Sequence, residues 1–440
     1  MTDSELVLAT AEPIISSDAS LTLQKQCAKV IKEQAESVVR HAVSRWASSE
    51  DNFDPELSTN LLASIFAFRE LDPVAQTQII LHPTFRYWVQ AMRRTSRGDE
   101  PEREKQFARS LVDFVWYEQV IEHKLNQTWT VWTDDRGGLR CSRLSKFIEF
   151  GREYSNKPVD ISPSSGGAMF SLVSGEEAYI SADVLQNKAK PSTKKSVQNN
   201  FYISDAPLVA DDKVEIWARD PWLRVDLTGT NQRTTGVNFF GTKDELYFEE
   251  SQPEFYATAL NFLKEIWIEQ YEDLLRFTHV IVPMLPSQNV NRAFTVSSRQ
   301  GAIFVDAVEP HLMVENLIHE NAHIKLRQIQ LLDRLIENPS DESQKFSVPW
   351  RPDPRPIPGI FEGLWVFTHI AEFRLKLFVL EDSVEYLQAF EKLIEDLGAA
   401  HQILSDNARL TIIGQQFLEK MGEWINNLKK RKKCNETAAK

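Results

Sequence analysis

Residues 317–324 read Leu317-Ile318-His319-Glu320-Asn321-Ala322-His323-Ile324 and carry an HExxH motif inside an apolar stretch. The surrounding run from 311 to 335 contains no Gly or Pro, and its apolar residues recur at helical spacing, which predicts a helix. In a helix, side chains at i and i+4 lie one turn apart on the same face, so both imidazoles can face one divalent metal ion with Glu320 beside them. The stretch therefore predicts a helix that carries a mononuclear metal site.

Features around the motif support a helix there. Pro310 stands where a first-turn proline is expected, and the acidic residues Asp306 and Glu309 lie close by on its N-terminal side. Five-residue patterns also arise by chance, and an HExxH match is expected in roughly one chain in a hundred of this composition. The alternative is a helix whose two histidines serve only packing.

A third ligand is needed, because catalytic zinc commonly takes three protein ligands and non-haem iron a 2-His-1-carboxylate face. The proline-rich segment 349–359 indicates a stiff, extended loop, followed by an apolar helix from about Ile360 to Leu380. Glu362 falls in the first turn of that helix among aromatic residues, where an unpaired carboxylate would be costly to bury. We therefore predict Glu362 as the third ligand. The alternative is a glutamate at the helix N-terminus that is stabilised only by the helix dipole. The competing ligand is His369, which otherwise reads as a packed core histidine.

The HExxH helix is followed by Pro349-Trp350-Arg351, then by Asp353, Arg355-Pro356 and Pro358-Gly359, and then by an aromatic helix. This order resembles the HExxH-motif peptide-modification family of ribosomal peptide natural product pathways, and the upstream segment 81–88 also resembles that family. The resemblance implies an Fe(II) and 2-oxoglutarate-dependent dioxygenase that hydroxylates a peptide at a β-carbon. The family pattern has a His near the start of the aromatic helix, where this chain has Glu362, and a carboxylate there suits an iron facial triad as well.

An oxygenase of this kind also needs a cation for the distal carboxylate of the keto acid, and the planar fork of Arg suits a carboxylate better than Lys does. Arg355 is the first choice because it matches the Arg-Pro of the family segment, and Arg351 is the second. Both lie in the proline-stiffened loop just before Glu362, where a rigid backbone loses less entropy on binding. The alternative for each is a surface arginine that pairs with Asp353 or stacks on Trp350.

A zinc peptidase is the second interpretation of the motif. In that case Glu320 would accept the proton of a water whose pKa the metal lowers, and a Tyr, His or Arg would stabilise the oxyanion. Tyr386 and His369 are available, although nothing in their spacing favours them. The longer HExxHxxGxxH arrangement is absent, because Leu326 and Ile329 stand at the corresponding positions. In an oxygenase, Glu320 would only orient the groups around the metal. A non-catalytic helical interaction protein is the third interpretation.

Composition excludes several other classes. With 42% hydrophobic residues, 11 Trp and 25 Phe in 440 residues, the chain can bury a large core. It has no apolar run of about eighteen residues, and acidic residues stand in its first twenty positions where a secretory signal would be basic. The net charge of -13 argues against a nucleic-acid partner. The basic run 429–433 is expected to be a solvated helix end, with contact to a leader peptide or a membrane surface as the alternative. Three Cys without metal-ligand spacing are typical of a reducing cytoplasm, and the oligomeric state stays open.

The patterns together predict an α+β protein, mainly helical, with a small mixed or antiparallel β region before the HExxH helix. We expect a helical region over 1–126, a mixed region over 127–308, and the metal-site and C-terminal helices over 309–440. Helical patterns cover 21–46, 55–70, 83–94, 102–125 and 254–277, and β-prone runs fall at 128–132, 177–180, 213–217, 223–227 and 301–306. Turn or linker composition marks 162–167 and 187–195. An edge strand beside the metal helix could pair with an extended peptide, so a peptide substrate is expected under either chemistry.

Overall fold

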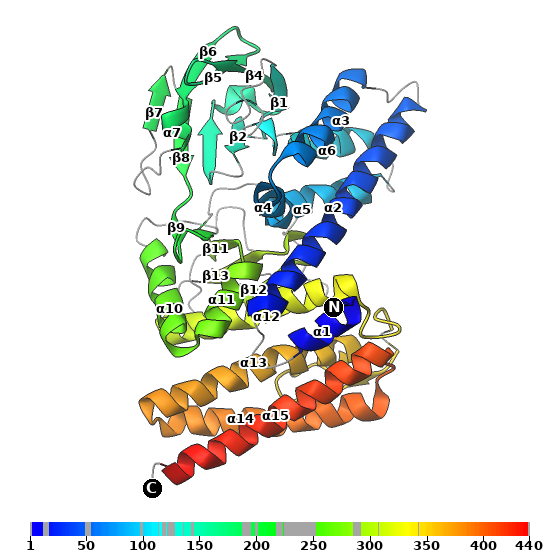
Figure 1. Ribbon diagram of the computed structural model, residues 1–440, viewed down its shortest axis with the longest axis vertical. Helices are drawn as coiled ribbons and strands as arrows, with labels where there is room; N and C mark the ends of the chain where they lie inside the picture. Colours follow the sequence, from blue (N-terminus) through cyan, green and yellow to red (C-terminus); the bar gives the residue numbers. More distant parts are fainter. Residues whose placement is uncertain are drawn as a thin grey trace.

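Helices and several small sheets make up the computed structural model of the chain, which confirms the expected α+β class with mainly helical content (Figure 1). The structure describes residues 2–11, 17–48, 54–96, 100–112, 114–116, 120, 128–134, 136–141, 145–186, 195–198, 201–216, 223, 252–284, 292–306, 308–341 and 343–438. No helix in these ranges is long and apolar enough to cross a bilayer.

The N-terminal helices pack around one long helix, α2, that runs from the upper part of the molecule to its middle (Figure 1). The others in this group are α1 (Asp3–Thr10), α3 (Pro55–Glu70), α4 (Pro73–Leu81), α5 (Pro83–Thr95) and α6 (Pro101–Val112), and α2 spans Ser17–Ala47. Asp54 and Asp72 cap the starts of α3 and α4. Each helix has a proline in its first turn, where a main-chain N–H would have no partner within the helix, so the missing N–H of proline costs nothing. The expected helix over 102–125 ends at Val112, and most of the residues beyond it lie outside the described ranges.

Two four-stranded antiparallel sheets follow in the chain and lie beside the upper helices. One has the order β1 (Trp129–Trp132), β4 (Pro158–Ser164), β5 (Gly167–Leu172), β6 (Glu177–Ser181), and the other β2 (Gly138–Cys141), β3 (Lys146–Glu149), β8 (Phe201–Asp205), β7 (Lys195–Gln198). The turn expected at 162–167 is the hairpin between β4 and β5, with Gly166 at a φ of 77° that favours glycine. Of the linker expected at 187–195, only Lys195 is described, as the first residue of β7, and the rest lies outside the described residues together with most of the strand expected at 223–227.

A five-stranded mixed sheet forms the middle of the molecule. Its order is β12 (Ala293–Phe294), β13 (Ala302–Asp306), β11 (Val280–Met284), β10 (Val214–Ile216), β9 (Leu208–Val209). The three inner strands are parallel and buried at every position. The mainly apolar sequences of β11 and β13 are typical of such strands, whereas β10 carries the buried Glu215 between two apolar residues. The edge strand β12 runs antiparallel to β13, and Arg292 fastens its start by contacting both carboxylate oxygens of Asp306 at 3.2 and 3.1 Å.

The helix expected over 254–277 is two helices, α10 (Gln252–Ile266) and α11 (Ile268–Phe277), which meet at Trp267. Trp267 has a φ of -149° and a ψ of 78°, outside the helical region, so the helical pattern continues through a real break in the backbone. The sequence pattern does not reveal this break, because α10 and α11 each bury one apolar face and their apolar residues recur at helical spacing on both sides of Trp267.

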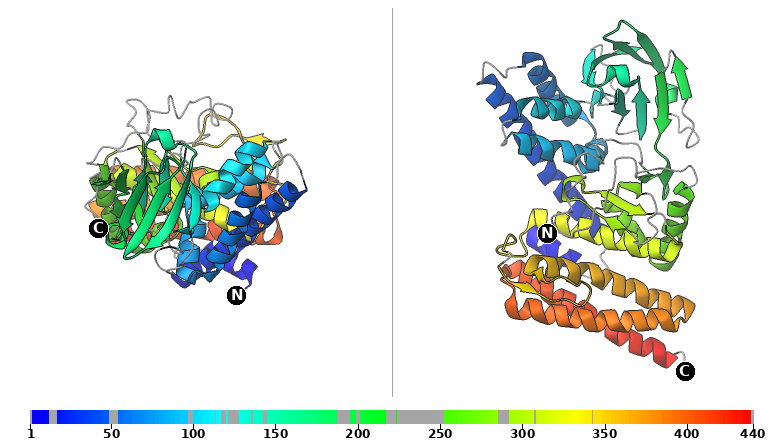
Figure 2. Two further views of the ribbon diagram at one scale, coloured as in Figure 1. Left: turned by 90° about the horizontal axis from the view of Figure 1, so that it is seen from above. Right: turned by 180° about the vertical axis from the view of Figure 1, so that it is seen from behind.

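The metal helix of the prediction is α12 (Pro310–Leu332), which lies under the central sheet. Pro310 occupies its first turn, and the carboxylate of Glu309 accepts hydrogen bonds from two main-chain N–H groups of that turn. Below α12 lie α13 (Ile357–Glu381), α14 (Val384–Asn407) and α15 (Ile412–Ala438), as Figure 2 shows from behind. A small hairpin, β14 (Lys345–Phe346) with β15 (Arg355–Pro356), connects α12 to α13.

The start of α13 corrects one expectation. The helix begins at Ile357, so Pro358 and Gly359 lie in its first turn, and Glu362 lies in the second turn rather than the first. Proline fits there because the N–H that it lacks has no partner in a first turn. The extended loop therefore ends earlier than its proline content indicates.

Candidate metal centre

The two histidines of the motif lie on one face of α12, as their i, i+4 spacing requires. Their Nε2 atoms are 3.2 Å apart. Two nitrogen ligands about 2.1 Å from one ion stand about 3.0 to 3.4 Å apart at angles between 90° and 110°. Burial and the neighbouring His323 lower the pKa of His319 to about 3, so its imidazole is neutral at physiological pH. The pair therefore has the separation that a shared divalent ion needs, and the neutral ring of His319 adds no positive charge that would repel it.

Glu362 reaches this pair from α13, but it contacts the far side of His323. Its Oε1 lies 2.7 Å from Nδ1 of His323, so an Nδ1–H donor leaves Nε2 free to bind a cation. Burial alone would raise the pKa of Glu362, but the contacts with His323 and the charge of Arg327 lower it to about 2. The carboxylate is thus ionised and orients one ring of the pair. Its role as a third ligand stays a prediction.

Aromatic side chains connect the proline-rich loop to the pair. The ring of His319 meets Phe367 edge to face at a centroid distance of 5.3 Å, and Trp350 lies 5.1 Å from Phe367 on the other side. Gly363 makes this packing possible, because a Cβ at that position would lie 3.0 Å from the indole of Trp350. The loop before α13 is therefore held against the helix face beside the histidines.

Glu320 is the buried carboxylate of the motif, with only 3% of its surface exposed. Its Oε1 lies 4.0 Å from Nε2 of His319, on the side of the ring where an ion would sit. Burial raises the pKa of Glu320, although His323, Arg327 and a hydrogen bond with the Thr295 side chain oppose that rise. A carboxylate whose pKa is raised by burial accepts a proton more readily than an exposed one, which suits Glu320 to proton transfer beside a cation site.

Arg327 is a site residue that the sequence analysis missed. It stands one further turn along α12 from His323, and its Nη2 lies 3.6 Å from Oε1 of Glu362. Its Nη1 donates to the hydroxyl of Thr295 at 3.3 Å, just after the edge strand β12. The spacing could have found it, because Arg327 continues the i, i+4 series of the two histidines.

The two arginines predicted to anchor a keto acid are both bonded to one carboxylate. Nε of Arg351 lies 3.0 Å from Asp353, and Nε of Arg355 lies 3.2 Å from the other oxygen of the same side chain. This is the surface pairing that the sequence left open as the alternative. Among the described residues, these two carboxylate oxygens are the ion-pair partners of the two guanidinium groups, and the role of Arg351 and Arg355 as anchors stays a prediction.

The other candidate groups lie away from the pair. His369 is buried between Trp365 and Trp424, and its Nδ1 contacts the main-chain oxygen of Trp365 at 2.9 Å, which makes it a packed core residue. The hydroxyl of Tyr386 lies 2.8 Å from Nδ1 of His311, near the start of α12. Neither group is placed to stabilise an oxyanion at the histidines.

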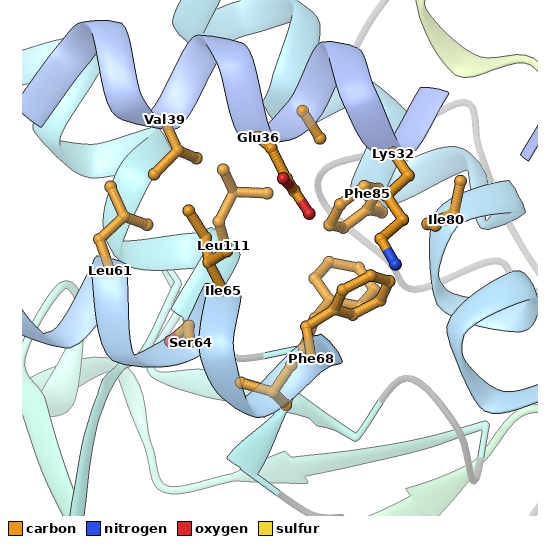
Figure 3. A pocket seen from close by; sticks show the side chains of 13 residues that line it. Lys32, Glu36, Val39, Leu61, Ser64, Ile65, Phe68, Ile80, Phe85 and Leu111 are labelled. Atoms are coloured by element: carbon orange, nitrogen blue, oxygen red, sulfur yellow. The ribbon is translucent and has the colours of Figure 1, made fainter. Parts of the chain in front are cut away.

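Two hollows lie elsewhere in the molecule, and they differ from each other in the polarity of the side chains that line them. One of about 50 Å³ lies among α2, α3 and α6 and is lined almost entirely by apolar side chains (Figure 3). The two charged residues that line it already have polar partners. Lys32 donates a hydrogen bond of 2.8 Å to Gln76, and Glu36 forms an ion pair with Arg69. The other hollow has about 290 Å³ and includes His82, Glu215 and His279.

The polar groups of the larger hollow form a network of their own. Oε1 of Glu215 accepts a hydrogen bond of 2.6 Å from Ser145, and Oε2 accepts one of 3.0 Å from Arg140, which also contacts His82. Nδ1 of His82 accepts from the main-chain N–H of Thr84 at 3.2 Å. Both ring nitrogens of His82 therefore have partners within the protein. The network joins His82 at the start of α5 to Arg140 on β2 and to Glu215 on β10 of the central sheet.

Within the described ranges, no three His, Cys, Asp or Glu side chains are arranged around one point as a complete metal site. The histidine pair fits a cation by its separation, and Glu362 on α13 contacts His323 at 2.7 Å. No family model matches the chain, and no curated protein is similar to it in sequence. Function is therefore inferred from the motifs and from the geometry of this site.

Proposed function

We propose that the chain is a metal-dependent enzyme that modifies a peptide, an Fe(II) and 2-oxoglutarate-dependent dioxygenase acting on a ribosomally made precursor peptide. The observation that carries a metal role is the 3.2 Å separation of the Nε2 atoms of His319 and His323 on one helix face. The choice of oxidation follows the family resemblance. His319 and His323 would hold the ion, with Glu362 as the proposed third ligand.

Bound iron and the keto acid would supply the oxidising chemistry that places a hydroxyl on a peptide carbon. The protein's own groups position and shield that chemistry. Glu362 fixes the ring of His323, and Phe367 packs against the ring of His319. Trp350 and the loop around it cover Phe367 and limit access of water from that side.

A peptide is the proposed substrate because the edge strand β12 lies beside α12. Its outer side faces no further strand in the described sheet, so an extended chain could add to it by main-chain hydrogen bonds. Thr295, which directly follows β12, contacts both Glu320 and Arg327. A peptide on this edge would therefore pass close to the site.

Zinc-dependent peptide hydrolysis is the second candidate function, and the position of Glu320 favours it. A hydrolase needs a base near the ion, and Oε1 of Glu320 lies 4.0 Å from a ligand nitrogen in a buried position. Glu320 would take a proton from water and pass it to the leaving amine. An oxygenase gives the same carboxylate no proton to transfer.

We also propose that the protein acts in the cytoplasm. Cys27, Cys141 and Cys434 are free thiols, two of them buried. Unpaired cysteines are typical of a reducing compartment. Cell fractionation with an antibody to the chain tests this assignment, and recovery from an oxidising compartment would contradict it.

Metal content after purification tests whether the chain is a metalloenzyme. Wild-type protein should carry iron or zinc at close to one ion per chain by mass spectrometry, and His323→Ala should carry none. His41→Ala is the matched control, because His41 is exposed on α2, and it should retain full occupancy. Full occupancy in His323→Ala would exclude the site, and an empty wild type that stays empty after iron or zinc is added would favour a helical interaction protein.

Consumption of 2-oxoglutarate distinguishes the oxygenase from the zinc peptidase, because only the oxygenase uses this co-substrate. With Fe(II) in air, an oxygenase should convert 2-oxoglutarate to succinate even without its peptide, at a slow uncoupled rate. With Zn(II), a peptidase should cleave a fluorogenic peptide library, and Glu320→Gln should lower that rate by about a hundredfold or more. Cleavage without any keto-acid turnover would replace the oxygenase proposal with the hydrolase.

A further inference from the structure

The guanidinium of Arg327 lies at the metal pair but is only weakly engaged. Its contacts of 3.3 Å with Thr295 and 3.6 Å with Glu362 are longer than the 2.7 to 2.9 Å that is usual for charge-assisted hydrogen bonds. A guanidinium has five N–H donors, so most of them remain available for a ligand. The side chain is 23% exposed, which leaves it accessible from the site.

Other arginines of this chain show the contrast. Arg374 holds Glu315 with two hydrogen bonds of 3.1 and 2.6 Å, and Arg292 holds Asp306 through both carboxylate oxygens. These are closed pairs with fork geometry. Arg327 has the same fork, but its contact with Glu362 is a single long one of 3.6 Å between Nη2 and Oε1, so the fork is not closed by two hydrogen bonds.

A second arginine is buried close enough to Arg327 for their positive charges to interact. Arg86, on α5, is 4% exposed, and its Nη1 has no hydrogen-bond partner in the part of the chain that the structure describes. Burial lowers the pKa of Arg86 to about 10, and the positive charge of Arg327 contributes to that shift. A buried cation without a partner is costly, and an anion nearby would remove much of that cost.

Beside the histidines, the site therefore presents the guanidinium of Arg327 with most of its N–H donors free, and the positive charge of Arg86 acts on Arg327. The site is thus suited to receive an anionic group beside the metal pair, and the open fork of Arg327 matches the two oxygens of a carboxylate.

We propose that Arg327 binds a carboxylate at the histidine pair, with the buried charge of Arg86 adding to the attraction. In combination with the proposed function, that carboxylate is the distal one of the keto acid, and Arg327 takes the role expected of Arg355. A peptide C-terminus offers the same chemistry, which a carboxypeptidase would need. The residue binds and positions a ligand in either case.

Binding to metal-free full-length protein tests this without turnover. Calorimetric titration uses three probes: 2-oxoglutarate, glutarate, and a short peptide with a free C-terminus beside its amidated form. Arg327→Gln should weaken the carboxylate that binds wild type by at least about tenfold, and Arg327→Lys should restore part of it. Arg334→Gln, at an exposed position just after α12, is the matched control and should bind as wild type does.

The probes identify the source of the carboxylate. Binding of both dicarboxylates supports the co-substrate, whereas binding of only the free-acid peptide supports a peptide terminus. Arg351→Gln and Arg355→Gln should leave either affinity unchanged. Arg86→Met should weaken binding by a smaller factor, and circular dichroism checks that each variant is folded.

A residue-specific measurement completes the test. Phenylglyoxal modifies accessible guanidinium groups, and peptide mapping by mass spectrometry should show that the bound carboxylate protects Arg327 but not Arg334. Equal affinity of wild type and Arg327→Gln, or no binding of any probe to wild type at millimolar concentration, would overturn the proposal. Since no metal is present, these outcomes are independent of the iron and zinc assays.

Discussion

The indole Nε1–H of Trp365 donates a hydrogen bond of 3.0 Å to the main-chain oxygen of Ala322, which lies between the two histidines of the motif. Trp365 is fully buried and stands on α13 three residues after Glu362, so both side chains lie on the same side of that helix. The bond therefore sets how α13 aligns with α12. It also sets where the carboxylate of Glu362 meets His323.

Trp365→Phe should weaken both the fold and the metal site. The substitution removes the hydrogen bond and leaves a small cavity, so we expect a loss of about 2 to 3 kcal/mol in the free energy of unfolding. Metal affinity should fall as well, because α13 can then shift against α12. Urea unfolding and competition with a chromophoric chelator measure the two effects.

Trp424→Phe is the matched control for this variant. Trp424 is also buried, and its indole donates to Glu372 at 3.1 Å. The control should lose similar stability while keeping the metal affinity of wild type. Equal loss of affinity in both variants would show that the Trp365 bond has no specific effect on the site.

Glu362→Gln should lower metal affinity by at least about tenfold, either as a lost ligand or as a weaker partner for the ring of His323. The amide keeps the size of the carboxyl group but removes its charge. A chelator-competition titration measures the change, with Glu337→Gln at an exposed position as control. Unchanged affinity in Glu362→Gln would remove this residue from the metal centre.

Glu215→Gln should destabilise the protein in a pH-dependent way. Burial would raise the pKa of Glu215, but Arg140, His82 and Ser145 lower it to about 2. A carboxyl whose folded-state pKa is lowered stabilises the fold above its unfolded pKa, and that contribution disappears as the pH falls from about 4.5 toward 2. The difference from wild type should be about 3 kcal/mol at pH 7 and should shrink below pH 4.

Urea unfolding at pH 7, 4 and 3 measures this difference. Glu177→Gln, at an exposed position of β6, is the control and should follow wild type at each pH. A constant difference between Glu215→Gln and wild type across this range would mean that the charge of Glu215 contributes nothing to stability.

Gly414→Ala should cost about 1 to 3 kcal/mol of stability or more. A Cβ at this position would lie 1.7 Å from the main-chain oxygen of Leu335, so the start of α15 would have to move away from the segment after α12. Gly359→Ala is the matched control, because the nearest atom to its Cβ is 3.8 Å away. Thermal unfolding compares the two, and equal melting temperatures would contradict the close approach.

The elements with a strong local pattern could be predicted from the sequence. The bounds of α3 agree with the expected 55–70, and β13 lies within the expected 301–306, because caps and continuous apolar runs determine them locally. The metal helix was also predicted, since Pro310 and Glu309 mark its start. Periodicity failed where the backbone breaks inside a continuous pattern, as it does at Trp267.

Only the site residues that lie on one helix could be placed together from the sequence, because their spacing along α12 determines which of them share a face. The approach of His319 and His323 follows from their i, i+4 positions, and Arg327 could have been found by extending the series. The edge strand β12 is too short for any pattern to mark it. The buried position of Arg86 depends on the packing of α5 in three dimensions, which no local pattern specifies.

The buried ion pair of Lys325 with Asp273, at 2.7 Å, lies two residues beyond His323 and faces away from it on α12. Asp273 also accepts a hydrogen bond of 2.7 Å from Ser20, so three helices share one neutralised charge cluster. The helix is thereby rigid before any ion arrives. Loading of the ion should proceed without coupled folding, so the apoprotein should show the same hydrogen-exchange protection along α12 as the loaded form.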